Sequence, residues 1–186
     1  MMADNIKDKE QITSVSENKR YMQTLDDTRT INLLITLLNE SVEKCYTKDN
    51  VLIENCMEQA SVARIFYYMQ NAIIKDKRFI SLRRLNLDCE YFKNNDDLKR
   101  TNSKPKGTRP DLILQQRKYY RNNFLVVEFK THKNNRYNAD FNKLKDFTSV
   151  NGTYNYTLGV FVKLKYEKAS YTYFIKGEEI PKQAIF

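Results

Sequence analysis

Apolar residues recur at three- and four-residue steps in two N-terminal stretches, and this spacing predicts two amphipathic helices. The first helix is expected from Arg29 to Cys45 and the second from about Val51 to Ile74. Glu58 lies four residues before Val62, so the periodicity places this carboxylate on the apolar side of the second helix. Residues 1–28 are polar without sustained periodicity, which predicts a flexible N-terminal arm.

The next part of the chain changes to the two-residue alternation of strands. Residues 80–92 are expected to form a strand, and residues 93–109 an exposed loop because they are charged and contain Gly and Pro. Two further strands, Asp111 to Gln116 and Asn123 to Lys130, are joined by a polar turn and form a hairpin. The second is almost continuously apolar, which favours a central strand buried on both faces.

A helix from about Ala139 to Phe147 and two closing strands, Tyr154 to Lys165 and Ser170 to Lys176, complete the pattern. Two helices, three strands, a helix and two strands in this order predict an α/β fold with a mixed sheet flanked by helices. The 186 residues are 41% hydrophobic, which is enough for one core. We therefore expect a single domain over residues 29–186, with its core at about 50–176.

Composition narrows the chemistry that the chain can perform. With one His and no Trp, a His-rich metal site and a histidine-based nuclease site are excluded, and carboxylates, lysines and tyrosines must carry any catalysis. Cys45, Cys56 and Cys89 are far apart, so neither a disulfide framework nor a zinc cluster is expected. The sequence contains no apolar run of export-signal or membrane-spanning type, and we expect a soluble cytoplasmic protein with no membrane contact.

The formal charge of +9 is unevenly distributed. Residues 1–56 hold 7 Lys/Arg and 10 Asp/Glu, whereas residues 57–186 hold 25 and 13. A basic domain favours a polyanionic partner such as nucleic acid, although a basic protein without such a partner is the simpler alternative. The loop at 93–109 is expected either to contact phosphates or to be merely solvated, through five basic residues: Lys99, Arg100, Lys104, Lys106 and Arg109.

One group of polar residues stands in otherwise apolar segments. Asp111 opens one strand of the hairpin, and Glu128, Phe129 and Lys130 end the other, with Glu128 and Lys130 on one face. Two carboxylates and the Phe129 backbone carbonyl are oxygen ligands suited to Mg²⁺ or Mn²⁺, and a lysine can stabilise phosphoryl charge. Glu58 could reach this site as a further ligand. The alternative is a surface pair of Glu128 and Lys130, with Asp111 capping a turn.

With these residues the chain resembles the PD-(D/E)xK nuclease superfamily, and within it small uncharacterised prokaryotic and phage-type members. Asp111, Glu128 and Lys130 match the defining motif, and the resemblance covers roughly residues 50–165. Further matching positions are Glu58, Arg64, Ile65, Tyr67 and Tyr68, then Asp88, Glu90 and Tyr91, then Asp140, Lys143 and Leu144, and the stretch Tyr154 to Val160.

The resemblance implies a restriction endonuclease-like core in the order αβββαβ, here with an extra N-terminal helix. It also implies a Mg²⁺-dependent (endo)nuclease that hydrolyses phosphodiester bonds in DNA, a metal-activated water attacking in line. Asp111 and Glu128 would then be metal ligands, Lys130 the catalytic lysine and Glu58 the helical acid. Glu54, one turn earlier, is the alternative helical acid.

Three other residues have two interpretations each. Glu90 is either an outer carboxylate of the site or a solvent-facing residue paired with Arg83 or a loop lysine. Lys143 contacts the scissile phosphate, reaches a carboxylate of the site or is solvated. His132 could touch DNA, but a lone histidine in this place is more often a bystander.

The alternative function is a non-catalytic nucleic-acid-binding or assembly module that retains the fold. Double-strand cutting needs two sites, which makes a homodimer the expected assembly for a nuclease of that kind. The acidic N-terminal region would suit a protein partner that supplies target recognition.

Overall fold

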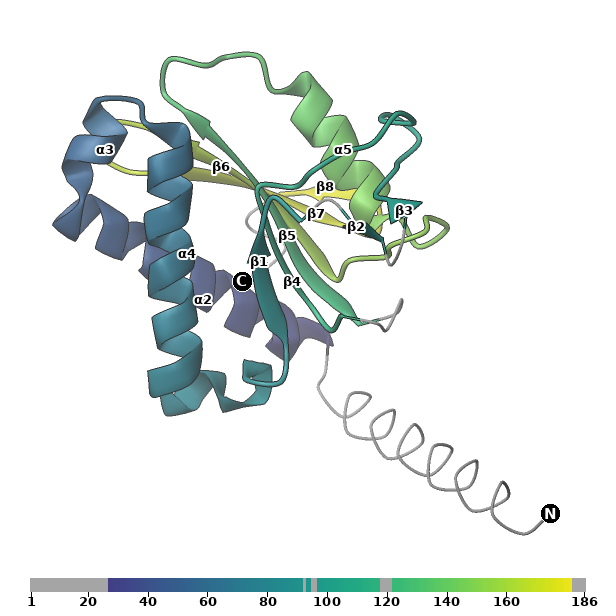
Figure 1. Cartoon of the computed structure of the whole chain (residues 1–186), viewed down its shortest axis with the longest axis horizontal. Coiled ribbons are helices and arrows are strands. Elements are labelled where there is room, and N and C mark those ends of the chain that lie inside the picture. The colour runs from purple at the N-terminus through teal and green to yellow at the C-terminus, as the bar shows by residue number, and fades with distance from the viewer. Residues whose placement is uncertain (1–26, 92, 95–96, 118–121, 182–186) are drawn as a thin grey trace, which may run out of the picture.

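The computed structural model describes residues 27–181 except 92, 95–96 and 118–121, and in these residues helices cover both faces of a six-stranded mixed sheet (Figure 1). The helices are α2 (Asp27–Lys48), α3 (Asn50–Glu54), α4 (Glu58–Lys75), the 3₁₀ helix η1 (Lys77–Leu82) and α5 (Asn138–Thr148). The strands are β1 (Asn86–Cys89), β2 (Lys93–Asn94), β3 (Asp97–Leu98), β4 (Leu112–Gln115), β5 (Asn123–Thr131), β6 (Leu158–Leu164), β7 (Ser170–Ile175) and β8 (Glu178–Ile180). The N-terminal arm predicted at 1–28 lies outside the described residues, except that 27 and 28 begin α2.

The main sheet has the order β1-β4-β5-β6-β7-β8. Only the β5–β6 pair is parallel, and all other neighbours are antiparallel. Parallel neighbours need a crossover, which α5 provides between β5 and β6. The prediction of a mixed sheet flanked by helices, with β5 as a central strand, is confirmed.

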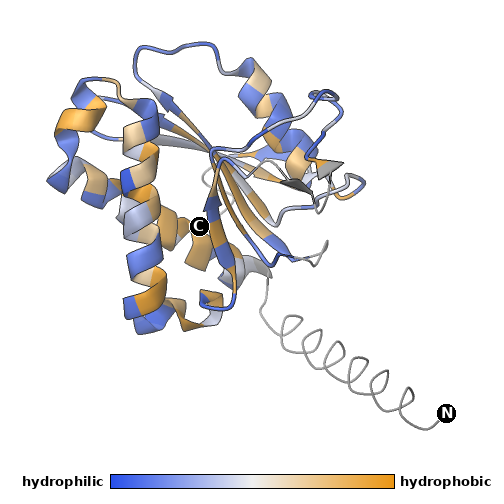
Figure 2. Ribbon diagram, viewed as in Figure 1, coloured by the Kyte–Doolittle hydropathy of each residue, from blue (hydrophilic) through white to orange (hydrophobic). Residues whose placement is uncertain are grey.

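Side chains of the sheet alternate between two apolar clusters, one on each face. On one face Leu125 and Val127 pack with Leu34 of α2 and Ile65 of α4, while Val126 packs on the other face under α5. Figure 2 shows the resulting hydrophobic strands between helices whose outer sides are more polar. Burial of these two clusters is the main stabilising contribution to the fold.

The predicted continuous helix at 51–74 is wrong. The chain forms α3 and α4 as separate helices, and Cys56 between them has a φ of 57°. A residue in this left-handed conformation cannot continue a right-handed helix. The break makes Glu58 the first residue of α4 instead of a residue in mid-helix.

The predicted strand at 80–92 is wrong in its first half. Residues Lys77–Leu82 form η1, begun by Asp76, whose side chain accepts a hydrogen bond from the Arg78 N–H. The strand itself is only β1, and Glu90 follows it with a φ of 45°. The burial within β1 does not alternate as predicted either, since Asp88 is buried and Cys89 is exposed.

The hairpin strands and the helix after them lie within two residues of their predicted positions. The first closing strand is shorter than predicted, because Tyr154 and Tyr156 precede it and pack against Phe147 of α5 from non-strand backbone. Strand β8 and the small β2–β3 hairpin were not predicted. In the described part of the chain, none of the helices is both long and apolar enough to cross a membrane.

Candidate active site

The β4–β5 hairpin brings Asp111 next to the end of β5. Asp111 immediately precedes β4, and its Oδ2 accepts a hydrogen bond of 2.7 Å from the Phe129 N–H. Its backbone C=O accepts a bond of 3.1 Å from the N–H of Glu90, which anchors it to the end of β1. Burial raises the pKa of Asp111, while the Phe129 N–H and the ammonium groups of Lys130 and Lys143 oppose that rise.

Glu128 lies in the middle of the cluster and is 1% exposed. Its Oε2 is 2.6 Å from Nζ of Lys143 on α5, whereas its Oε1 is buried without a hydrogen-bond partner among the described residues. Burial and the nearby Asp111 carboxylate raise the pKa of Glu128 well above its ordinary value, and Lys143 acts in the opposite direction. An unpartnered buried carboxylate oxygen is energetically unfavourable unless a cation or a proton joins it.

Lys130 is held by several oxygen atoms. Its Nζ is 3.2 Å from Oε1 of Glu58, 3.0 Å from the Phe129 C=O and 3.8 Å from Oδ2 of Asp140. Burial lowers the pKa of Lys130, but Asp140, Glu58 and Asp111 together outweigh this effect, and the pKa is raised. Lys130 is therefore an ammonium cation at neutral pH.

Glu58 reaches the cluster from the first turn of α4. Besides Lys130, it binds the Thr131 N–H through Oε2 at 3.3 Å. Its side chain is 31% exposed, yet its contacts with Lys130 and Thr131 of β5 place it on the sheet-facing side of α4, as the periodicity predicted. Glu54 instead lies on α3 and accepts a hydrogen bond from Asn50 at 3.1 Å. The acid that meets Lys130 is thus Glu58, because the break at Cys56 separates the two helices.

Asp140 joins the cluster, although reasoning from residue chemistry assigned it no role. It lies in the first turn of α5, with Oδ1 3.6 Å from Nζ of Lys143 and its side chain 14% exposed. It also faces Lys130, so it links the two lysines. The three-residue spacing of Asp140 and Lys143 is the local signal for this pair, but its contact with β5 is not local.

The cluster contains more carboxyl than ammonium groups. Among the described residues it brings four carboxyl groups, of Glu58, Asp111, Glu128 and Asp140, to the two ammonium groups of Lys130 and Lys143. A divalent cation would favour the ionised form of these carboxyl groups and balance their charge, and Oε1 of Glu128, which has no hydrogen-bond partner among the described residues, would gain a ligand. Within the described ranges, however, no three His, Cys, Asp or Glu side chains are grouped closely enough to hold a metal ion alone. A cation here would depend on two carboxylates, a backbone carbonyl and water or substrate oxygens.

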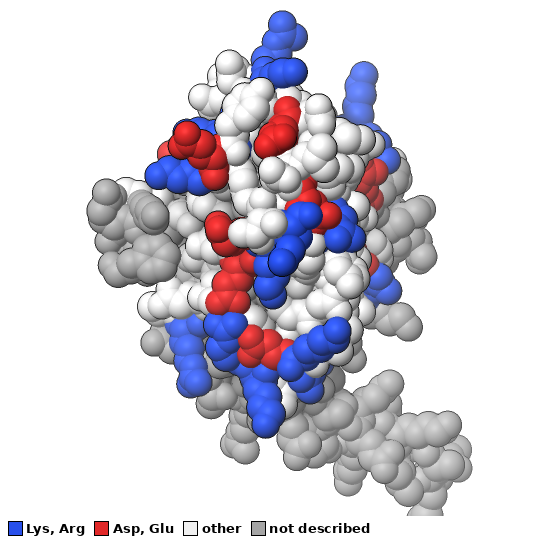
Figure 3. Space-filling model, turned by 90° about the vertical axis from the view of Figure 1, so that its left-hand side faces the viewer, with Lys and Arg blue, Asp and Glu red and all other residues white. Residues whose placement is uncertain are grey.

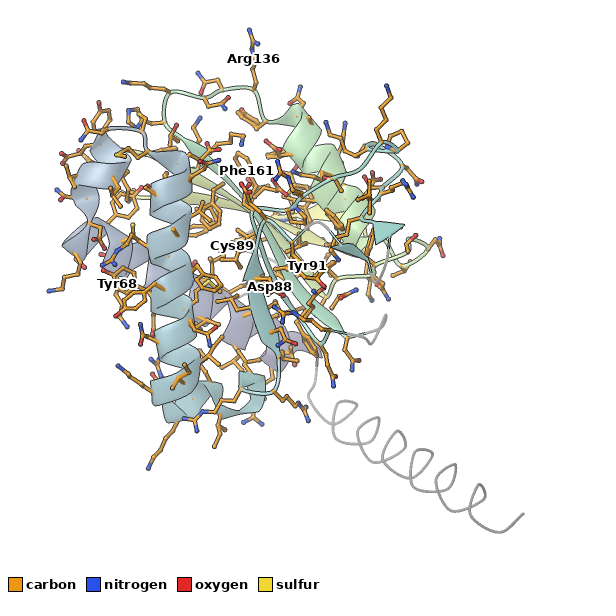
Figure 4. The ribbon with its side chains drawn as sticks, viewed as in Figure 1. Tyr68, Asp88, Cys89, Tyr91, Arg136 and Phe161 are labelled. Carbon is orange, nitrogen blue, oxygen red and sulfur yellow. The ribbon has the colours of Figure 1, made fainter. Side chains whose placement is uncertain are left out.

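A pocket of about 370 Å³ opens beside the cluster, between α4 and the β1–β4 edge. Glu58, Asp111, Cys89 and Glu90 contribute to its wall. The Cys89 side chain lies on the α4 side of β1 (Figure 4). Burial and the neighbouring acids Asp88, Asp111 and Glu90 raise the pKa of the Cys89 thiol to about 11, so it is neutral at ordinary pH. The acidic groups, not this thiol, determine the charge of the pocket.

Glu90 makes a solvent-exposed ion pair at the mouth of this pocket. Its Oε2 is 3.5 Å from Nη1 of Arg109, and both side chains are about half exposed. The predicted partner Arg83 instead donates to the Ile73 C=O at 3.1 Å. Glu90 therefore lies near the site without a direct contact to Lys130.

The basic loop is not uniformly exposed. Arg100, Lys106 and Arg109 are exposed and Lys104 is half-buried. Lys99 is only 2% exposed, so the prediction of an exposed, phosphate-contacting lysine is wrong at this position.

Tyrosine rings account for the burial of Lys99. Its Nζ lies over three rings, 4.9 Å from the centroid of Tyr154, 5.6 Å from that of Tyr91 and 5.9 Å from that of Tyr156. Burial lowers the pKa of Lys99 to about 8, against a smaller opposing effect of Asp88. Lys99 therefore anchors the loop to the tyrosines through apolar and cation–π contact.

Acidic and basic side chains are interspersed on the face that carries α3 and α4 (Figure 3). Arg78, for example, binds both Glu40 at 2.7 Å and Asp76 at 2.7 Å. Arg64 likewise pairs with Asp49 at 3.0 Å. The basic excess of the chain is therefore not concentrated on this face.

The candidate site is formed by side chains from four separate segments of the chain, at Glu58, Asp111, 128–130 and 140–143. Comparisons of the chain with models of protein families, with curated proteins and with solved structures give no match.

Proposed function

We propose that the protein is a Mg²⁺- or Mn²⁺-dependent nuclease of the PD-(D/E)xK type that hydrolyses phosphodiester bonds in DNA. The observation that carries this proposal is the convergence of Asp111, Glu128, Lys130 and Glu58 at one end of β5. The sheet order around β5 and the helices on both faces are compatible with a restriction endonuclease-like core.

Asp111, Glu128 and the Phe129 carbonyl are the groups that would hold the metal ion. They fit a hard cation because they supply oxygen ligands, and because Oε1 of Glu128 has no hydrogen-bond partner within the described part of the chain. When bound, the ion would lower the pKa of a water nucleophile and neutralise charge on the phosphoryl oxygens.

Lys130 would act as a fixed cation and not as a proton acceptor. Its pKa is raised, and contacts with Glu58 and the Phe129 C=O fix the position of its ammonium group. A preorganised positive charge stabilises the additional negative charge that develops on the phosphoryl group in the transition state. Lys143 would hold Glu128 in position, which favours its interpretation as a carboxylate partner over direct phosphate contact.

DNA would reach this site beside the basic loop. Arg100, Lys104, Lys106 and Arg109 remain the candidates for phosphate contact, since Lys99 is buried. A homodimer that pairs two such sites remains our proposal for double-strand cleavage. Of the acidic N-terminal region proposed to dock a recognition partner, residues 1–26 lie outside the described residues.

A cleavage assay tests the proposal directly. Circular and linear DNA, single- and double-stranded, would be incubated with Mg²⁺, Mn²⁺ or EDTA and with wild-type, Lys130→Ala or Lys75→Ala protein. Lys75 is the matched control, an exposed lysine in the last turn of α4. We expect metal-dependent cleavage by the wild type and Lys75→Ala, and none by Lys130→Ala. Equal cleavage by Lys130→Ala would contradict the assignment.

A non-catalytic nucleic-acid-binding or assembly module is the second candidate, and the Lys143–Glu128 pair favours it. At 2.6 Å this pair already neutralises the most buried carboxylate of the cluster without any metal. Calorimetric titration with Mg²⁺ and Mn²⁺ separates the two functions. Saturable binding that disappears in Asp111→Ala supports the nuclease, whereas DNA binding without metal binding supports the module.

A further inference from the structure

A stacked pair of aromatic rings lies outside the proposed catalytic cluster. Tyr166 follows β6 and is 60% exposed, one of the most exposed large apolar side chains in the described part of the chain. Its ring centroid is 4.0 Å from that of His132, with 37° between the ring planes. One side of the tyrosine ring is therefore supported by the imidazole while much of the ring remains accessible.

Both members of the pair are positioned by contacts with the α2–α4 segment. Nε2 of His132 is 3.2 Å from Sγ of Cys56 in the break before α4. The carbonyl of Lys165, next to Tyr166, accepts a hydrogen bond of 2.6 Å from the Tyr46 hydroxyl of α2. The stack is thus preorganised before any ligand binds, which reduces the entropy lost on binding.

The stack lies at the same sheet edge as the catalytic cluster. His132 directly follows Thr131, whose N–H binds Glu58, and it is two residues beyond Lys130. Strands β5 and β6 are parallel, with Lys130 in register with Lys163, so both strands end at this edge. Two residues of a β-strand span about 7 Å, so a nucleic-acid strand bound at Lys130 would pass close to the rings of His132 and Tyr166.

The surroundings of the stack are polar and predominantly basic. Exposed lysines lie next to both rings in the sequence, with one exposed acid, Glu167, among them. Arg136 projects outward from the loop that follows β5 (Figure 4). The exposed basic residues of the two loops are Lys133, Arg136, Lys165 and Lys168. Cations beside an open aromatic ring favour a ligand that has both phosphates and flat bases.

We propose that His132 and Tyr166 form a stacking platform for an unpaired nucleobase, and that the substrate therefore has a single-stranded segment next to the scissile phosphate. This inference rests on the proposed nuclease function and specifies its substrate class. In an intact duplex both faces of a base are covered by its neighbours, so the open ring of Tyr166 would have no base to receive. On a single strand each base offers its face without sequence preference.

Binding measured in EDTA tests the platform independently of cleavage. Fluorescence anisotropy would follow a labelled single-stranded oligothymidylate, a duplex of equal length and an abasic strand of the same backbone. We expect Tyr166→Ala to weaken oligothymidylate binding at least about fivefold, the loss of one base–aromatic stack. Tyr166→Phe should bind within about twofold of the wild type, because the ring is retained. Tyr67→Ala is the matched control, since Tyr67 is 51% exposed on α4, nine residues from Glu58.

The abasic strand and the duplex make the test specific. For each of these two ligands, the wild type and Tyr166→Ala should have the same affinity, because neither ligand presents an unstacked base. An equal affinity of Tyr166→Ala and wild type for oligothymidylate would overturn the proposal. So would an equal loss for oligothymidylate and the abasic strand, or a failure of the wild type to bind oligothymidylate.

A spectroscopic reporter is available because the chain has no tryptophan. In Tyr166→Trp the single indole should be quenched by saturating oligothymidylate and not by the abasic strand, and unchanged emission on bound oligothymidylate would refute stacking. Cleavage separates the two proposals. If the protein stacks a base but shows no metal-dependent cleavage, the stacking platform is supported and the nuclease function is rejected. If it cleaves and Tyr166→Ala leaves cleavage unchanged, the nuclease function is supported and the platform is rejected.

Discussion

Nζ of Lys143 on α5 lies 2.6 Å from Oε2 of Glu128, the most deeply buried carboxylate of the cluster. Since Oε1 of Glu128 has no partner in the described residues, Lys143 is its one direct ion-pair contact there. The pair connects α5 to the central strand and gives Glu128 a fixed place beside Asp111. The stability of the fold and the geometry of the site therefore depend on the same lysine.

Removal of Lys143 should destabilise the metal-free protein. In Lys143→Met the buried Glu128 loses its counter-charge, and we expect the free energy of unfolding at pH 7 to fall by about 3 kcal/mol. Urea unfolding in EDTA measures this loss. Adding Glu128→Gln to Lys143→Met should restore at least half of it. Lys145→Met, on the same helix, should change stability by less than about 1 kcal/mol, and a similar loss in both single variants would contradict the role given to Lys143.

The charge of Glu58 should matter for cleavage, and that of Glu54 should not. Glu58→Gln retains an oxygen that can accept from the Thr131 N–H but removes the negative charge opposite Lys130. We expect the cleavage rate to fall about tenfold or more. Glu54→Gln, on the separate helix α3, should cleave within twofold of the wild type. Initial cleavage rates at saturating Mg²⁺ distinguish the two variants. A large loss of rate in Glu54→Gln with none in Glu58→Gln would identify Glu54 as the helical acid of the site.

Asp111→Asn should separate folding from metal binding. The asparagine carbonyl can still accept the hydrogen bond from the Phe129 N–H. The substitution also removes a buried carboxyl group whose pKa is raised by burial, so stability in EDTA should be retained. Cleavage should fall at least about a hundredfold. In the wild type, Mn²⁺ at 100 times its Kd should add about 2.7 kcal/mol of stability, seen as a higher Tm. If the same metal raises the Tm of Asp111→Asn equally, Asp111 is not a ligand.

Lys99 should make stability depend on pH in the alkaline range. Burial lowers its folded pKa to about 8, below the ordinary lysine value of 10.5, so the folded state disfavours the ammonium form. The buried ammonium group therefore lowers the free energy of unfolding by its full amount below pH 8. This loss of stability decreases as the pH rises toward 10.5. Relative to Lys99→Met, the wild type should gain about 2 kcal/mol between pH 7 and pH 9.5.

Chemical denaturation of both proteins at the two pH values measures the effect of Lys99. Lys106→Met serves as the control, because Lys106 is an exposed lysine in the same loop. It should show no such relative gain. A gap between wild type and Lys99→Met that is the same at both pH values would show that Lys99 does not titrate in this range.

Local patterns were sufficient for the elements that form the centre of the site. The apolar run of β5 and its two-residue alternation placed Glu128 and Lys130 on one face, and the polar turn before β5 indicated the hairpin that carries Asp111. These features depend on neighbours close in sequence. The break at Cys56 was not visible in the periodicity, because the apolar spacing continues across Cys56 although its backbone φ is not helical.

The amino-acid sequence by itself determined the α/β class, the central strand and the candidate motif of two acids and a lysine, since each follows from short-range periodicity and residue chemistry. Only the tertiary structure decided that Lys143 and Asp140 join the cluster and that Lys99 is buried among tyrosines. It also decided between Glu58 and Glu54. The reason is physical: the desolvation and pairing of a charged side chain depend on elements distant in sequence that pack against it.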